Sequence, residues 1–421
     1  MSQEKQVCDS NFHGEHSESL PIGTKGLPIC RSARGSFSLV KEEVSLPCAV
    51  VRQSAIENNI EWMQAFANKN NVKLCPHGKT TMTPDLFKQQ LDNGAWGITV
   101  ASAAQAEIAV LAGAKQIIIA NQVVGKVNMQ IVVNLIQNHN VTVYSCVDSV
   151  ANVEAWERVV SSAGVTVPLF IELGVEGGRC GCRTSDDVYK LAQAIHQAPH
   201  TELKGIELYE GVISGDNAEQ DIREFLGLAI SLLTELKQEY KLEEPIISGA
   251  GSAWYDVVAE EFSQLVDLVG VIRPGCYAIH DTGIYEDAQN LVQSRASINN
   301  GVACDLSGDL VSSLEVWAYV LSVPEKGKAV VGLGKRDVAF DAGLPIIERV
   351  IRDGKEVTLD GLTSTKVMDQ HMFVEMEQDT LQVGDIVAMS TSHPCLTFDK
   401  WRYIGVVDEQ DNVTHWIPTF F

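Results

Sequence analysis

The stretch "WGITVASAAQAEIAVLAG", Trp96 to Gly113, decides the fold class, because it joins a short apolar strand directly to a helix. Its first part lacks the polar alternation of a half-exposed strand, which is typical of parallel strands buried on both faces. Its second part begins with Ser102 and Gln105, whose spacing is that of a capping box. The stretch therefore predicts one β/α unit of a parallel sheet.

The same unit repeats between Cys48 and Ile272. A series of about 250 residues has the size of a (β/α)8 barrel. An open doubly wound sheet is the alternative, but no G-x-G-x-x-G follows an early strand. There is one strand more than a barrel needs, and the first could be a lead-in strand. The candidates are "CAVV", "VKLCP", "WGITVA", "QIIIA", "VTVYSCVD", "VPLFIEL", "LKGIELY", "PIIS" and "VDLVGVI".

Helix ends are marked by local signals. Ser54 and Glu57 have capping-box spacing at the start of the first helix. Thr83 is the expected N-cap of the second helix, with Pro84 at its first position and Gly94 after its end.

Beyond about residue 305 the chain contains strand patterns separated by turn signals and no helix pattern, which predicts an antiparallel β domain. We therefore expect an N-terminal extension (1–44), a (β/α)8 barrel (45–305) and a C-terminal β domain (306–421). The strand candidates are "LEVWAYVLSV", "GKAVVGLG", "KVMDQHMFVEME", "VGDIVAMST", "WRYIGVVD" and "VTHWIPT".

Composition narrows the function class. The 421 residues carry 55 acidic and 32 basic side chains, a net charge of -23, which disfavours nucleic acid and anionic membranes as partners. The polar N-terminus has no apolar signal region, so a soluble cytoplasmic protein is expected. The ten cysteines include no CxxC pair and are expected to be reduced thiols.

Lys79 in "PHGKTT" follows the "VKLCP" strand and should stand at the mouth of the barrel. A lysine among apolar neighbours there can have a lowered ammonium pKa and bond an aldehyde. A solvated turn is the alternative. Two later loops, "SGAGS" (248–252) and "RPGCY" (273–277), could hold a phosphate at backbone N–H groups. An early lysine and a late phosphate site together indicate pyridoxal 5'-phosphate.

His393 and Cys395 in "SHPC" are two residues apart, and in an extended segment both side chains would point to one face. A thiolate with an imidazole makes half of a metal site and favours Zn²⁺ over Mg²⁺ or Ca²⁺. A buried cysteine beside a structural histidine is the alternative. His371 in "DQHMF" is either a neighbour of this site or a strand-face histidine.

From about Leu46 to the C-terminus the chain resembles the D-serine dehydratase / D-threonine aldolase family, which has the alanine-racemase-like fold and uses pyridoxal phosphate. The motifs that carry the resemblance occur in the family's order. They are "PHGKTT", "GAWGITVAS", "ANQ", "ELGVEGGRCG", "GIELYEG", "SGAGS", "RPGCY", "GKRDVAFDAGLP" and "SHPC".

The resemblance implies a role for each matching residue. Lys79 would bond the cofactor and later act as the base that removes the Cα proton, while His77 would border the cofactor. Arg179 would contact its phenolic oxygen, and Tyr209 would lie near its pyridine nitrogen. The phosphate would lie on the two loops, at Ser248, Gly249, Gly251, Ser252, Gly275, Cys276 and Tyr277.

The resemblance also places a divalent ion, Zn²⁺ or alternatively Mn²⁺, at His393 and Cys395. Aldolases of the family tend to carry His-x-Asp there and dehydratases His-x-Cys, so this chain is expected to be a D-serine dehydratase that acts as a homodimer. A D-threonine aldolase is the second reading. A non-catalytic pyridoxal-phosphate protein ranks third, because single-domain carriers of this fold lack the C-terminal domain.

Overall fold

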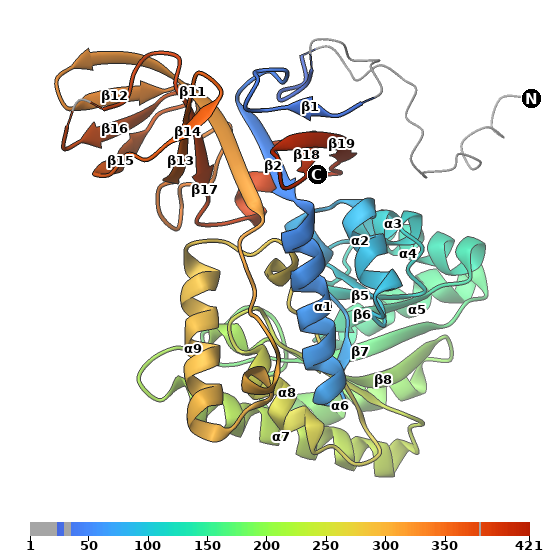
Figure 1. Cartoon of the computed structure of the whole chain (residues 1–421). Coiled ribbons are helices and arrows are strands. Elements are labelled where there is room, and N and C mark those ends of the chain that lie inside the picture. The colour runs from blue at the N-terminus through green and yellow to red at the C-terminus, as the bar shows by residue number, and fades with distance from the viewer. Residues whose placement is uncertain (1–22, 29–34, 379) are drawn as a thin grey trace, which may run out of the picture.

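A computed structural model of the chain describes residues 23–28, 35–378 and 380–421. It contains a parallel eight-stranded sheet and a second sheet of eleven strands, which lies above the first in Figure 1. The strands of the parallel sheet are β3 (Lys73–Leu74), β4 (Ile98–Val100), β5 (Gln116–Gln122), β6 (Thr142–Val147), β7 (Val167–Leu173), β8 (Thr201–Leu208), β9 (Ile246–Gly249) and β10 (Val269–Ile272).

The parallel sheet closes on itself. Its strands run in the order β3-β10-β9-β8-β7-β6-β5-β4, and a parallel bridge between His77 and Thr99 joins the end of β3 to β4. The Thr99 N–H donates to the carbonyl of Pro76 at 2.8 Å. The predicted (β/α)8 barrel is therefore confirmed, and the open doubly wound alternative is excluded.

Helices alternate with the barrel strands and cover the outside of the ring (Figure 1). Within the described ranges, none of them combines the length and the apolar character that crossing a bilayer requires. They are α1 (Gln53–Lys69), α2 (Pro84–Asp92), α3 (Ala103–Leu111), α4 (Lys126–His139), α5 (Val150–Ala163), α6 (Ser185–Gln197), α7 (Ala218–Tyr240), α8 (Tyr255–Ser263) and α9 (Ile284–Asn299).

Two of the three predicted helix starts agree with the structure. The Ser102 hydroxyl accepts from the N–H of Gln105, and Thr83 is the N-cap before Pro84. The prediction for Ser54 was wrong, because the N-cap of α1 is Arg52, two residues earlier, and the Ser54 hydroxyl donates to Glu409, in the turn between β18 and β19, instead. A tertiary contact has replaced the local cap.

The first of the nine strand candidates is not a barrel strand. β2 (Cys48–Arg52) pairs with β11 (Leu314–Glu325) and β18 (Tyr403–Val407) in the second sheet, and the chain then passes straight into α1. Figure 1 shows this connection as the blue strand and helix that link the two sheets. The barrel thus begins with β3, which the sequence pattern alone could not distinguish from β2.

The second sheet confirms the predicted antiparallel β domain, apart from the parallel β2–β18 pair. Sequence reasoning missed β13 and β14, which have few buried side chains to mark them. A short helix, α10 (Cys395–Phe398), precedes β18. The remaining strands are β1 (Phe37–Ser38), β12 (Lys328–Val331), β13 (Ile346–Arg352), β14 (Lys355–Val357), β15 (Leu362–Val367), β16 (Met372–Met376), β17 (Ile386–Ser390) and β19 (Asn412–Pro418).

The described part of the N-terminal extension packs on the C-terminal sheet. β1 pairs with β19, and the Lys25 ammonium lies 2.7 Å from Asp337 and 3.9 Å from the ring centre of Trp401. The extension was expected on the surface or on this part of the molecule, but residues 1–22 and 29–34 lie outside the described residues.

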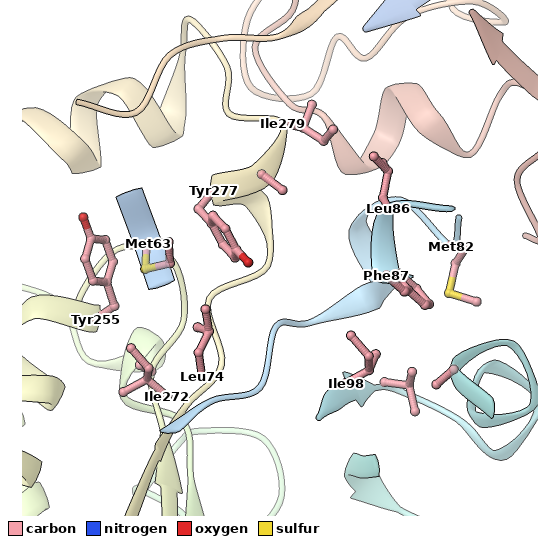
Figure 2. Packing of buried hydrophobic residues seen from close by; sticks show 14 of the residues in the cluster. Met63, Leu74, Met82, Leu86, Phe87, Ile98, Tyr255, Ile272, Tyr277 and Ile279 are labelled. Carbon is pink, nitrogen blue, oxygen red and sulfur yellow. The ribbon is translucent and has the colours of Figure 1, made fainter. Parts of the chain in front are cut away.

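The apolar core reaches up to the segment that carries Lys79. Figure 2 shows Phe87 of α2 near Leu86 and Met82, beneath the turn that follows β3. A Cβ atom at Gly78 would lie 2.3 Å from the Phe87 ring, so glycine at this position lets the turn rest on the core. The backbone on either side of Lys79 is buried, which fixes where its side chain leaves the barrel wall.

We expect Gly205→Ala to destabilise the barrel by about 3 kcal/mol or more, because a Cβ atom there would lie 1.7 Å from the carbonyl oxygen of Ile246 on the neighbouring strand. Urea unfolding measures the change. Gly227→Ala is the control, since this exposed position in α7 has no atom within 4 Å of the added carbon and should gain about 0.5–1 kcal/mol. Equal stability of the two variants would contradict the close approach of β8 and β9 at Gly205.

Candidate active site

A cavity of ≈ 220 Å³ opens at the carboxyl ends of the barrel strands, where barrel enzymes have their active sites. Most of the predicted cofactor residues line it, although they come from five different strand ends. The predicted residues in its wall are His77, Lys79, Arg179, Tyr209, Gly251, Ser252, Gly275 and Cys276. The barrel thus brings the early lysine and the late glycine loops to one place.

Lys79 lies in the 3-10 turn η1 (Gly78–Thr80) after β3, and its side chain is exposed into the cavity. Its surroundings are mixed rather than apolar, since charged side chains from several strands share the wall with alanines. His77 accepts from the Lys79 N–H at 3.4 Å through Nδ1. Burial, and then the charges of Lys79 and Arg273, lower the pKa of His77 well below its usual value, so the ring is neutral.

Arg179 and Tyr209 form one unit although they come from different loops. The guanidinium carbon lies 4.5 Å from the centre of the Tyr209 ring. Burial raises the pKa of the Tyr209 hydroxyl, and the nearby Glu210 carboxylate adds to the shift, so the phenol is neutral. A Cβ atom at Gly251 would lie 2.8 Å from this ring, which explains why the loop has glycine there.

The glycine loops are less open to an anion than expected. The Glu210 carboxylate accepts from the N–H groups of Ala250 at 3.0 Å and Gly251 at 2.8 Å. The Ser252 hydroxyl accepts from Gly275 at 3.3 Å and Cys276 at 3.2 Å. These last two bonds are long and end on a neutral rotatable group, so an anion could replace the hydroxyl.

Three of the predicted residues do not line the cavity. Ser248 and Gly249 are buried at the end of β9. The Tyr277 ring points into the hydrophobic core, as Figure 2 shows, and its hydroxyl accepts from Gln90 at 3.0 Å. The turn η3 (Cys276–Ala278) directs adjacent side chains to different sides, so only the Cys276 side chain faces the cavity.

Sequence reasoning missed a layer of buried charge at the cavity floor. Arg273 forms a buried ion pair with Glu207, and its Nε atom has no partner among the described residues. Burial raises the pKa of Glu172 to about 7, and the nearby Glu207 carboxylate adds to the shift. A glutamate near the end of each of two apolar strands, in "VPLFIEL" and "LKGIELY", was the available signal.

His393 and Cys395 lie together beside this cavity, but not in an extended segment. Cys395 is the first residue of α10, so a helical turn brings the thiol and the imidazole into contact. Hydrogen bonds from Cys276 and then His393 hold the pKa of Cys395 well below its usual value. The bond to Cys395, and that to Asp341, raise the pKa of His393 to about 9, so the pair is a thiolate and an imidazolium.

His371 is exposed in the turn between β15 and β16. Among the described residues, the set of three ligand atoms that all lie within 4.8 Å of one another is instead Cys146, Glu172 and Glu207 in the barrel interior. Two of these are already engaged, because Glu207 is paired with Arg273 and Glu172 accepts from Gln122.

Residues 51–280 match the family described as alanine racemase, N-terminal domain, and residues 313–407 match the putative serine dehydratase domain. The chain belongs to the alanine-racemase-like family. The first match includes the strand ends that carry Lys79, Arg179, Tyr209 and both glycine loops, and the second includes His393 and Cys395.

Three similar proteins illustrate the family. The 3-hydroxy-D-aspartate aldolase of Paracoccus denitrificans (strain Pd 1222) is 26% identical over 374 residues, which cover 87% of this chain and 89% of that protein. The D-threonine aldolase structure from Filomicrobium marinum has a TM-score of 0.75 and 23% identity, over 92% and 98% of the two chains. The D-threo-3-hydroxyaspartate dehydratase structure from Delftia sp. HT23 has a TM-score of 0.70 and 20% identity, over 91% and 99%.

The cavity fits the cofactor that this family implies, pyridoxal phosphate. It offers the primary amine of Lys79 for the aldehyde. For the phosphate it offers the N–H groups of Gly275 and Cys276, which donate to the Ser252 hydroxyl, a group that an anion could replace. The cation of Arg179 against the Tyr209 ring suits a phenolate oxygen, and the buried Arg273 Nε is a donor that no described residue pairs with. The Cys395 thiolate and the His393 ring, which would lose its extra proton on binding, fit a divalent metal at the edge of the cavity.

We expect Glu172→Gln to stabilise the protein at pH 8 by roughly 1–3 kcal/mol and much less at pH 5. The folded state raises the pKa of this carboxyl from 4.5 to about 7 and so binds its proton more tightly than the unfolded chain. The stability that Glu172 contributes to the wild type is therefore present at low pH, and it is lost as the pH rises from 4.5 to about 7. Urea unfolding at the two pH values measures the effect.

The exposed Glu176→Gln is the control and should change stability equally little at both pH values. A Glu172→Gln protein that is less stable than the wild type at pH 8 would contradict the raised pKa.

Proposed function

We propose that this protein is a lyase that acts on β-hydroxy-D-amino acids with pyridoxal phosphate and a divalent metal, and that it is a D-serine dehydratase. The observation that carries the proposal is the contact between two parts of the site. Thr80, next to Lys79, lies 3.5 Å from the Cys395 sulfur through its hydroxyl. Cys395, which we propose as a metal ligand, therefore contacts the residue next to the lysine that we propose to bond the cofactor.

The barrel residues would hold the cofactor. Lys79 Nζ would bond its aldehyde carbon, and the N–H groups of Gly275 and Cys276 would bind its phosphate with the Ser252 hydroxyl. Arg179 would bind its phenolic oxygen. When bound, the cofactor supplies an electron-withdrawing ring that makes the Cα–H bond of an attached amino acid acidic. Because the His77 ring is neutral, it adds no further positive charge beside the Lys79 amine.

The Lys79 amine would be released when the amino group of the substrate replaces it on the cofactor, and it would then take the Cα proton, because it lies next to both the cofactor site and the metal pair. His393 and Cys395 would hold the metal, and the thiolate favours Zn²⁺, with Mn²⁺ as the alternative. The metal supplies a Lewis acid for the β-hydroxyl of the substrate. Loss of the Cα proton and the hydroxyl removes water, and hydrolysis of the released enamine gives pyruvate and ammonia from D-serine.

The cysteine at position 395, two residues after His393, favours dehydration, because the aldolases of the family tend to carry aspartate there. The second candidate is a metal-dependent aldolase that forms glycine and an aldehyde, and it is supported by the aldolase names of relatives that cover most of the chain. Both reactions need the same cofactor, metal and β-hydroxyl group. We further propose that the protein acts as a homodimer in the cytoplasm.

We expect the protein, supplied with pyridoxal phosphate and Zn²⁺, to release pyruvate and ammonia from D-serine and no glycine. A chelator should abolish the reaction, and added Zn²⁺ should restore it. Product analysis on D-serine, D-threonine and D-threo-3-hydroxyaspartate compares the substrates. Glycine and an aldehyde from D-threonine as the main products would identify the aldolase instead.

We expect Lys79→Ala to lower the rate by at least about 10³-fold and to abolish covalent attachment of the cofactor. Borohydride reduction followed by peptide mass spectrometry measures the attachment directly. Lys88→Ala is the control, because this half-exposed lysine of α2 pairs with Asp92 of the same helix and does not line the cavity. Reduced cofactor still attached to the Lys79→Ala protein at another lysine would contradict the assignment.

A further inference from the structure

Two cysteines from different parts of the fold meet at the edge of the active-site cavity. The Cys276 and Cys395 sulfur atoms are 3.5 Å apart, and both thiols are free. Cys276 belongs to the barrel turn η3, whereas Cys395 opens α10 of the C-terminal domain. The Thr80 hydroxyl touches both sulfurs, at 3.6 Å and 3.5 Å. The contact between the two sulfurs therefore lies beside Thr80, the residue that follows Lys79.

The distance between the sulfurs suits two ligands of one metal ion. A disulfide would need about 2.05 Å. Two thiolates on one tetrahedral Zn²⁺, each about 2.3 Å from the metal, would lie about 3.8 Å apart. The observed 3.5 Å is close to this value, so both sulfurs could bind one ion with little movement of the backbone.

We propose that Cys276 is a third protein ligand of the metal, which Cys276, Cys395 and His393 hold together. This inference rests on the metal site of the proposed function and extends it. Two thiolates and one imidazole leave a single position of a tetrahedral ion open for the substrate oxygen, as a catalytic zinc site requires. A second thiolate also makes the site softer, so the preference for Zn²⁺ over Mn²⁺ should be strong.

The histidine is prepared for such a site. Its Nδ1 atom hydrogen-bonds the Asp341 carboxylate at 2.7 Å, which leaves Nε2 for a metal, and a carboxylate behind a histidine ligand is a common arrangement. The three donors do not all lie within 4.8 Å of one another, and because Cys395 contacts both of the others, the His393 side chain would have to turn towards Cys276 for all three to bind one ion. The metal then connects the barrel to the C-terminal sheet.

The interior set of Cys146, Glu172 and Glu207 is the competing site within the described residues. A metal there would have to displace Arg273 from Glu207 and Gln122 from Glu172. Cys276 and Cys395 have no such ion pair with arginine to break, since their contacts among the described residues are with each other, Thr80, Tyr285 and the proposed ligand His393.

Zinc X-ray absorption spectroscopy on the holoenzyme tests the inference, because it counts sulfur ligands without relying on activity. We expect about two sulfurs per zinc in the wild type and one each in Cys276→Ser and Cys395→Ser. Competition with a chelator should show a 10- to 100-fold loss of zinc affinity, roughly, in Cys276→Ser. The exposed Cys304→Ser is the control and should behave as the wild type.

Each alternative gives a distinct result. One sulfur per zinc in the wild type, unchanged in Cys276→Ser and lost in Cys395→Ser, overturns the third ligand but leaves the proposed function intact. Loss of zinc in Cys146→Ser, with Cys276→Ser and Cys395→Ser unaffected, places the metal in the barrel interior. This result overturns the third ligand and also the metal site of the proposed function. Circular dichroism and thermal unfolding without metal establish that each variant is folded, so that a lost ligand is not mistaken for a lost fold.

Discussion

The closure of the barrel between the end of β3 and β4 is the constraint on which the site depends. The Thr99 N–H bonds the carbonyl of Pro76, and the next residues, His77 to Lys79, turn over the top of the wall. Because the same ring places β10 next to β3 and β9 next to β10, the loops after those two strands reach the cavity that Lys79 enters. A lysine and two glycine loops nearly 200 residues apart along the chain thus become one site.

The second sheet contributes side chains to the candidate active site, because α10 follows its strand β17 at the edge of the cavity. β2 belongs to this sheet and continues into α1, so the barrel and the sheet share a rigid connection. α10 of the same domain delivers the thiol of Cys395 to Thr80 and Cys276 of the barrel. Neither domain alone contains both the lysine and the histidine–thiol pair, so a reaction that needs both depends on how the domains pack.

The layer of ionisable side chains at the floor of the cavity is the feature that the sequence indicated least. Burying Glu207 is tolerated because Arg273 neutralises it, whereas Glu172 has a neutral amide partner and keeps its proton to higher pH. Such a layer can hold a polar cofactor above an otherwise apolar barrel interior. Each of these three side chains comes from a different strand, and their pairing follows from the order of the strands around the ring.

The sequence by itself determined the alternation of buried strands and helices, the change to an antiparallel domain, and the residues that could bond a cofactor, since these follow from local periodicity and residue chemistry. It could not show that β2 leaves the barrel, that Tyr277 faces the core, or that Glu210 occupies two loop N–H groups. Only the tertiary structure decided these points, because each depends on a partner distant in sequence. The meeting of Cys276 with Cys395 is of the same kind: it arises from packing two domains, which no local pattern encodes.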